Sequence, residues 1–199
     1  ENTVQLVLAS ASPARKATLE SAGVRPVVEV STIDEKAVID AYGVSAAPEV
    51  ALLLARAKAE DVAGRRCQCE ADPSTRIILG CDSVLELDGA VHGKPTDADQ
   101  ARARWHSMRG RQGILHTGHW LVDARADGTG GTLGAVASTT VYFADVTDAE
   151  IEAYVASGEP LRVAGAFTVD GLGGPFITGI EGDHHNVVGI SLPLLRELL

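Results

Sequence analysis

Patterns typical of buried strands alternate with patterns typical of amphipathic helices along most of this 199-residue chain. Val4–Ala9 predicts a buried strand, and Pro48–Ala63, with apolar residues at helical spacing, predicts the clearest helix. Two long strand patterns, His116–Ala124 and Ala135–Val146, follow each other across a glycine-rich turn. Helices between strands favour parallel pairing, whereas adjacent long strands favour antiparallel pairing. We therefore expect an α/β protein with a mixed sheet.

The remaining elements follow from shorter patterns and capping residues. Further strands are expected at Val27–Val30, Arg76–Cys81, Val84–Leu87, Ala90–Val91, Phe167–Val169 and Phe176–Ile177, with a tight hairpin at Asp88–Gly89. Further helices are expected from Pro13 to near Gly23, from Thr96 to Met108, from Thr147 to Gly158 and from Pro193 onward, with a polar loop over Cys67–Thr75. No repeat or linker divides the chain, so we expect one domain over residues 1–199.

Charge and composition exclude several classes of function. The formal net charge is −10, from 17 Lys and Arg against 27 Asp and Glu, which disfavours a protein that grips long nucleic acids. No apolar stretch approaches the roughly 18 residues of a membrane span, and no signal-peptide pattern is visible. The three cysteines, Cys67, Cys69 and Cys81, cannot all pair with one another, which fits a reducing compartment.

Small and hydroxyl residues connect the first strand to the helix that follows it. In Ser10–Arg15, Ser12 is a good N-cap, and Pro13 suits the first helical position. A helix N-terminus presents free backbone N–H groups and a positive dipole end, which favour an anion. Two interpretations stay open: plain helix capping by Ser12, or a phosphate cradle formed by Ser10, Ser12 and Arg15.

A second candidate site begins at Asp82, which we expect at the end of an apolar strand, where α/β folds tend to build active sites. Ser83 beside it is suited to positioning a ligand or a water. A hairpin at Asp88–Gly89 would bring Lys94 back towards Asp82. The pair is either a structural ion pair or a metal ligand with a phosphate clamp. A turn-forming role for Asp82 is the other alternative.

None of the six histidines stands in a recognised metal-ligand pattern, so we expect all of them to be non-ligands. They are His92, His106, His116, His119, His184 and His185. The last two are adjacent, and in a strand their side chains would point to opposite sides.

Several short segments, in this order, resemble the Maf family of nucleotide pyrophosphatases, from Leu6 to Leu199. They are Leu8–Arg15, Val30–Glu35, Leu54–Ala59, Gly80–Val84, Gly93–Pro95, Tyr154–Pro160, Ala164–Phe167 and Asn186–Gly189. The resemblance implies hydrolysis of a nucleoside triphosphate to its monophosphate and pyrophosphate, with a divalent metal, usually Mg²⁺ or Mn²⁺. It also implies a cytoplasmic, often dimeric protein. The implied fold is a mixed, bent sheet flanked by helices, in two lobes around a cleft, similar to that of inosine triphosphate pyrophosphatases.

The resemblance also implies roles for individual residues. Phosphate would be held by Ser10, Ser12 and Arg15, and the triphosphate charge neutralised by Lys58 and Lys94. Asp82 would be the general base or a metal ligand that activates water, and Glu35 an acidic metal or water contact. Ser83 and Asp170 would contact the substrate.

The chain departs from the family pattern at four positions. Ala14 stands where the family commonly has arginine, Ser83 where it has threonine, Asp170 where it has glutamine, and Gly113 where it has histidine. The first three are associated with telling nucleotides apart, so the sequence leaves the preferred base open. The resemblance implies removal of non-standard or surplus nucleotides. A non-catalytic nucleotide-binding regulator of cell division and septum formation is the alternative.

Overall fold

The computed structural model describes residues 4–65 and 76–199, which include seven strands and seven α-helices. The strands are β1 (Gln5–Ala9), β2 (Val27–Val28), β3 (Arg76–Leu87), β4 (Ala90–His92), β5 (Gln112–Asp123), β6 (Thr132–Phe143) and β7 (Ile177–Glu181). The α-helices are α1 (Pro13–Ser21), α2 (Glu35–Tyr42), α3 (Ala47–Gly64), α4 (Ala98–Met108), α5 (Asp148–Ala156), α6 (His184–Val188) and α7 (Leu192–Leu198). Three short 3₁₀ turns are η2 (Glu159–Arg162), η3 (Ala164–Ala166) and η4 (Gly174–Phe176).

All seven strands form one mixed sheet in the order β2-β1-β3-β5-β6-β7, with β4 also paired to β3. Strand β1 runs parallel to β2 and β3, and every other pairing is antiparallel. The predicted mixed α/β class is therefore confirmed. The hairpin at Asp88–Gly89 is confirmed as well, because β3 and β4 pair directly across it.

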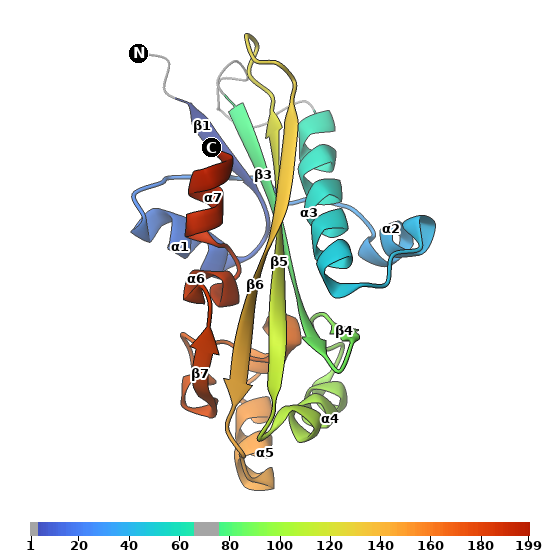
Figure 1. Ribbon diagram of the computed structural model, residues 1–199, viewed down its shortest axis with the longest axis vertical. Coiled ribbons are helices and arrows are strands. Elements are labelled where there is room, and N and C mark those ends of the chain that lie inside the picture. Colours follow the sequence, from blue (N-terminus) through green and yellow to red (C-terminus); the bar gives the residue numbers. More distant parts are fainter. Residues whose placement is uncertain (1–3, 66–75) are drawn as a thin grey trace.

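The long strands β3, β5 and β6 run along much of the long axis of the molecule, and helices flank them (Figure 1). On one face α3 packs against β3 and β5. Its approach is close because Gly80 and Gly118 face it: a Cβ at either position would collide with a backbone oxygen of α3. On the other face, α1 and α7 contribute Leu19 and Leu195 to a core cluster with Leu79 of β3.

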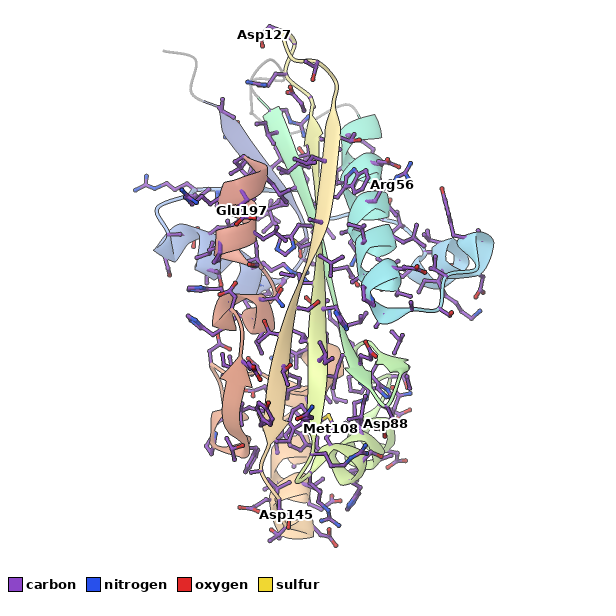
Figure 2. The ribbon with its side chains drawn as sticks, in the orientation of Figure 1. Arg56, Asp88, Met108, Asp127, Asp145 and Glu197 are labelled. Atoms are coloured by element: carbon purple, nitrogen blue, oxygen red, sulfur yellow. The ribbon has the colours of Figure 1, made fainter. Side chains whose placement is uncertain are left out.

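The two halves of the molecule have separate hydrophobic cores. The lower half in Figure 1 is built around Trp105, which makes edge-on contacts with Phe143, Tyr154 and Phe176. Met108, labelled in Figure 2, belongs to this cluster. The upper half contains the clusters between the sheet and α1, α3 and α7. Two lobes thus share one sheet, and the functional residues predicted on β3 lie between them.

Capping residues begin helices α1 and α5 at the predicted places. The side chain of Ser12 accepts a hydrogen bond from the Arg15 N–H at α1. Thr147 and Glu150 form the predicted capping box at α5, since each side chain bonds the other residue's backbone N–H. Each cap supplies a partner for a backbone donor that a helix leaves unpaired.

Some predicted elements are wrong or incomplete. Phe167–Val169 is not a strand, because the preceding Ala166 has φ 66° and turns the chain, while its carbonyl accepts a hydrogen bond from Trp105 Nε1. The strand predicted over Val27–Val30 has only two residues. Helices α2 and α6 were not predicted. The loop predicted over Cys67–Thr75 lies outside the described residues. None of the helices in residues 4–65 and 76–199 has the length and apolar character needed to cross a membrane.

Candidate active site

Asp82 and Ser83 lie in the interior of β3, so the prediction that Asp82 ends a strand is wrong. The reason is that β5 pairs with β3 on both sides of this point, including Asp82 with Gly118. The other edge of β3 changes partner here. Its parallel pairing with β1 stops at Gly80, and its pairing with β4 starts only at Leu85. Residues 81–84 of β3 therefore pair with neither β1 nor β4, and the candidate site lies along this gap.

On the α3 side of this gap, Lys58 joins two carboxylates. Its Nζ atom lies 2.5 Å from an oxygen of Asp82 and 2.8 Å from an oxygen of Glu35. The side chains of Lys58 and Asp82 are mostly buried, whereas that of Glu35 is half-exposed. Glu35 is available because Asp34 caps α2, which makes Glu35 the first residue of that helix. One ammonium therefore faces two carboxylates, a combination with net negative charge.

Burial and charge act in opposite directions in this cluster. Burial raises the pKa of Asp82, and the attraction of Lys58 and Arg15 offsets only part of that effect. Burial by itself lowers the pKa of Lys58, but the two carboxylates more than compensate, so its net pKa is raised. Lys58 thus stays protonated, and Asp82 accepts a proton more readily than an exposed aspartate.

On the α1 side, Arg15 is held by three acceptors, two of which come from distant parts of the chain. Its Nε atom donates to the carbonyl of Gly189 at 2.6 Å, and its two terminal nitrogens donate to the hydroxyls of Ser10 at 3.1 Å and Ser83 at 3.0 Å. The residue is only 9% exposed. Successive residues of a strand point to opposite faces, so Asp82 meets Lys58 on one face while Ser83 meets Arg15 on the other.

Thr117, which the sequence did not single out, and Asn186 support this arrangement. The hydroxyl of Thr117 lies 2.8 Å from that of Ser83 and donates to the carbonyl of Asn186 at 3.2 Å. The buried side chain of Asn186 donates in turn to carbonyl oxygens of Leu115 and Ala137. Asn186 and Gly189 belong to one of the segments that resemble the Maf family. The sequence does not show, however, that their carbonyl groups accept hydrogen bonds from Thr117 and Arg15.

Lys94 does not contact Asp82, although the chain approaches it as predicted. The last pair of the β3–β4 hairpin is Leu85 with His92, and Lys94 follows two residues later, toward the gap, with an exposed side chain. The adjacent Gly93 carbonyl accepts a hydrogen bond from Arg104 Nη1 at 2.5 Å. Arg104, from α4, is only 8% exposed and was not identified from the sequence.

Asp170 lies away from the cluster of Lys58, Glu35 and Asp82. It is exposed, and its carboxylate accepts a hydrogen bond from the Thr168 hydroxyl. It lines a groove of about 400 Å³ that is also lined by Ala14, by further residues of α1 and by residues of α6. Two of the positions where the chain departs from the family pattern, 14 and 170, therefore share one groove.

The donor set at the gap suits a hard divalent cation. Glu35 and Asp82 offer carboxylate oxygens, which Mg²⁺ and Mn²⁺ prefer, and Lys58 alone does not neutralise both. These two residues fit the metal that the family resemblance implies.

Sequence comparison finds similar proteins along almost the whole chain. A protein of Salinispora tropica is 57% identical over 98% of this chain and 83% of its own length, and one of Leifsonia xyli is 51% identical over 98% and 92%. Both are named nucleoside triphosphate pyrophosphatase. A solved structure titled nucleoside-triphosphatase / dITP/XTP pyrophosphatase, from Mycobacterium abscessus, covers 72% of this chain and 76% of its own, with 16% identity and a TM-score of 0.41.

A family model also matches nearly the whole chain. The model for the family described as Maf-like protein matches residues 5–199, which include every residue placed at the gap. The chain belongs to the Maf-like protein family.

Proposed function

We propose that the protein hydrolyses a nucleoside triphosphate to the nucleoside monophosphate and pyrophosphate. The observation that carries the proposal is the gap along β3, where Asp82 and Lys58 on one face lie next to Ser83 and Arg15 on the other. A ligand in a gap at a strand edge can reach both faces. The names of the relatives from Salinispora tropica and Leifsonia xyli support the same reaction.

Positive side chains at the gap bind the phosphates. Attack on a phosphorus surrounded by negative oxygens requires charge neutralisation, and arginine and lysine supply it. Arg15 is oriented in advance by its three hydrogen bonds, and Lys94 is free to move because it is exposed. The hydroxyls of Ser10 and Ser12, at the N-terminus of α1, complete the phosphate contacts. Ser12 also caps the helix, so both interpretations of this segment apply.

Asp82 acts as the general base that takes a proton from the attacking water. Its raised pKa brings it closer to neutral pH than an ordinary aspartate, which favours proton transfer. Lys58 holds the carboxylate in place through the 2.5 Å contact. Glu35 and Asp82 would hold a divalent metal, which when bound polarises phosphoryl oxygens and lowers the pKa of water.

The groove between α1 and α6 takes the nucleoside part of the substrate. Ala14 leaves space there, and the carboxylate oxygens of Asp170 accept hydrogen bonds, so Asp170 favours a base with an amino group. We also propose that the protein is a cytoplasmic homodimer and that it removes non-standard or surplus nucleotides. The regulator of cell division is not favoured, because a protein that only binds nucleotides does not need a buried carboxylate held by a lysine.

The test is a panel of common and modified nucleoside triphosphates, with Mg²⁺ or Mn²⁺ and pyrophosphate release as the readout. We expect turnover of at least one nucleotide, and we expect Asp82→Asn to remove most of it while the fold is retained. Asp127→Asn, at the far tip of the β5–β6 hairpin, is the matched control and should leave turnover unchanged (Figure 2). Tight nucleotide binding without any turnover would support the regulator instead. Near-normal turnover in folded Asp82→Asn would remove Asp82 from its assigned role.

A further inference from the structure

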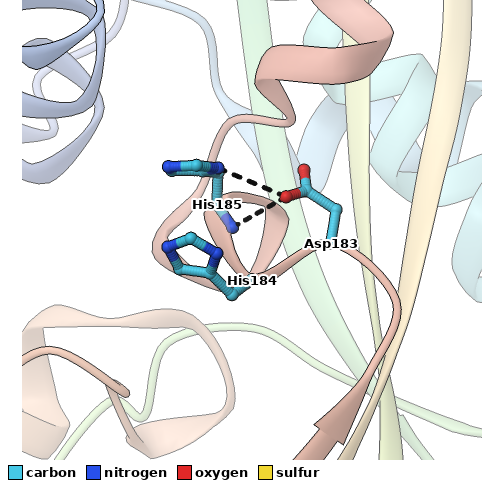
Figure 3. A group of neighbouring side chains, drawn as sticks. All are labelled: Asp183, His184 and His185. Carbon is cyan, nitrogen blue, oxygen red and sulfur yellow. Dashed lines mark hydrogen bonds and ion pairs between the residues drawn. The ribbon is translucent and has the colours of Figure 1, made fainter.

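We propose that Asp183, His184 and His185 form a second metal site, which takes a late first-row divalent ion such as Zn²⁺. The three side chains gather where β7 leads into α6 (Figure 3). One ligand atom from each lies within 4.8 Å of the others. The sequence interpretation of both histidines as non-ligands rested on the lack of a metal-ligand pattern, together with the expectation that their rings would point apart in a strand. They instead begin a helix, and their ring centres are 3.9 Å apart.

The geometry is close to that of a metal site before the ion binds. His185 Nδ1 lies 3.3 Å from Asp183 Oδ1. Two ligands of a tetrahedral zinc ion, each about 2.0–2.1 Å from it, are about 3.3 Å apart, so this pair already has the required spacing. His184 is exposed, so its ring can rotate toward the pair without disturbing the core.

The surroundings of the Asp183 carboxylate favour a bound cation. Its Oδ1 atom accepts the backbone N–H of His185 at 3.1 Å and keeps a second lone pair for a ligand. Its Oδ2 atom is buried and has no hydrogen-bond partner. Among the residues that the structure describes, its only ion-pair partner is His185, which is charged only when protonated. A partly buried carboxylate without a permanent countercharge is costly, and a bound divalent ion would compensate for it.

The ligand types distinguish this site from the one at the gap. Two imidazoles and one carboxylate suit zinc and its neighbours, whereas Mg²⁺ and Mn²⁺ prefer the oxygen ligands of Glu35 and Asp82. The proposed ligands are side-chain atoms, so the site does not depend on the short helix α6 as such.

An ion at this position would affect residues on both sides of α6. The carbonyl of Asn186 accepts from Thr117, and the carbonyl of Gly189 anchors Arg15. His184 and His185 also line the groove that contains Asp170. Binding would therefore stiffen the segment that orients Arg15, and the ion would lie at the wall of the groove.

The experiment measures Zn²⁺ binding by isothermal titration calorimetry in the absence of nucleotide, and compares variants. The wild type should bind one ion per chain more than the His184→Asn/His185→Asn double variant, and each single variant should bind that ion at least about tenfold more weakly. His106→Asn, which changes an exposed histidine on α4, is the matched control. Zn²⁺ at a hundredfold excess over its dissociation constant should raise the Tm by about 5–10 °C in the wild type and in His106→Asn, but not in the double variant.

Equal Zn²⁺ stoichiometry and equal Tm shifts in the wild type and the double variant would overturn the proposal. The Asp82→Asn variant distinguishes a failure of the proposed zinc site from a failure of the proposed function. It should lose turnover yet retain the ion bound by Asp183, and loss of that ion in folded Asp82→Asn would show that the two sites are one.

Discussion

Replacing Lys58 with methionine tests the electrostatic account of the site, because it removes the ammonium and keeps most of the apolar volume. The side chain of Lys58 is 15% exposed and that of Asp82 is 11% exposed, so Asp82 would be left as a nearly buried carboxylate. Removing one partner of a buried ion pair costs about 3–5 kcal/mol. Because some solvent reaches both groups, we expect a loss of stability of about 3 kcal/mol at pH 8, or roughly 6–12 °C in Tm.

The loss of folding stability in Lys58→Met should grow as the pH rises. Burial already raises the pKa of Asp82, and loss of the attraction from Lys58 raises it further. Between the pKa of Asp82 in the folded wild type and its higher pKa in the folded variant, the variant binds a proton that the wild type has already released. Stability relative to the wild type therefore falls as pH rises through that window, by at most ~1.4 kcal/mol per pH unit.

The assay is urea unfolding, followed by circular dichroism at pH 5 and pH 8, of the wild type, Lys58→Met and Lys58→Met/Asp82→Asn. The double variant has no buried charge at position 82 and should recover most of the stability that Lys58→Met loses at pH 8. A loss below about 1 kcal/mol at pH 8, or a loss that does not shrink toward pH 5, would refute the electrostatic reasoning.

Three further predictions concern other parts of the molecule. Gly80→Ala should destabilise the protein by several kcal/mol in urea unfolding, because the new Cβ collides with a backbone oxygen of α3, whereas Gly64→Ala, which has open space, should cost nothing. Burial lowers the pKa of His119 to about 4, so stability should fall as pH drops from about 6.5 toward 4, and a His119→Gln variant that is equally sensitive to pH would contradict this. Arg104→Met should release the loop that carries Lys94 and raise KM for the triphosphate several-fold at nearly constant kcat; an unchanged KM would remove Arg104 from that positioning role.

Local patterns predicted most of the fold because the caps and turns are local. The Ser12 cap, the Thr147–Glu150 capping box and the Asp88–Gly89 hairpin each involve residues within a few positions of one another. The errors occurred where distant contacts decide the conformation. Asp82 interrupts an apolar run, a pattern that predicts the end of a strand. Strand β3 nevertheless continues through Asp82, because β5 pairs with it there and because Lys58 of α3 contacts the carboxylate.

The sequence predicted which residues belong to the candidate site better than it predicted how they are arranged. The structure brings Lys58, Glu35 and Asp82 together, but Lys94 and Asp170 lie outside that cluster. No sequence pattern indicates that Gly189, 174 residues after Arg15, anchors its guanidinium through a backbone carbonyl, because any residue type offers that atom. Similarly, His184 and His185 share one side only because α6 begins there, and α6 has five residues and a weak pattern.

The central claim is that water attack assisted by Asp82 releases pyrophosphate from a nucleoside triphosphate. Phosphorus-31 NMR of the reaction mixture tests it most directly, since it distinguishes pyrophosphate from orthophosphate while the nucleotide products are followed in the same sample. The account predicts equal amounts of pyrophosphate and nucleoside monophosphate from the wild type and from Asp127→Asn, and almost none from folded Asp82→Asn. Release of orthophosphate and nucleoside diphosphate, or undiminished pyrophosphate from Asp82→Asn, would contradict it.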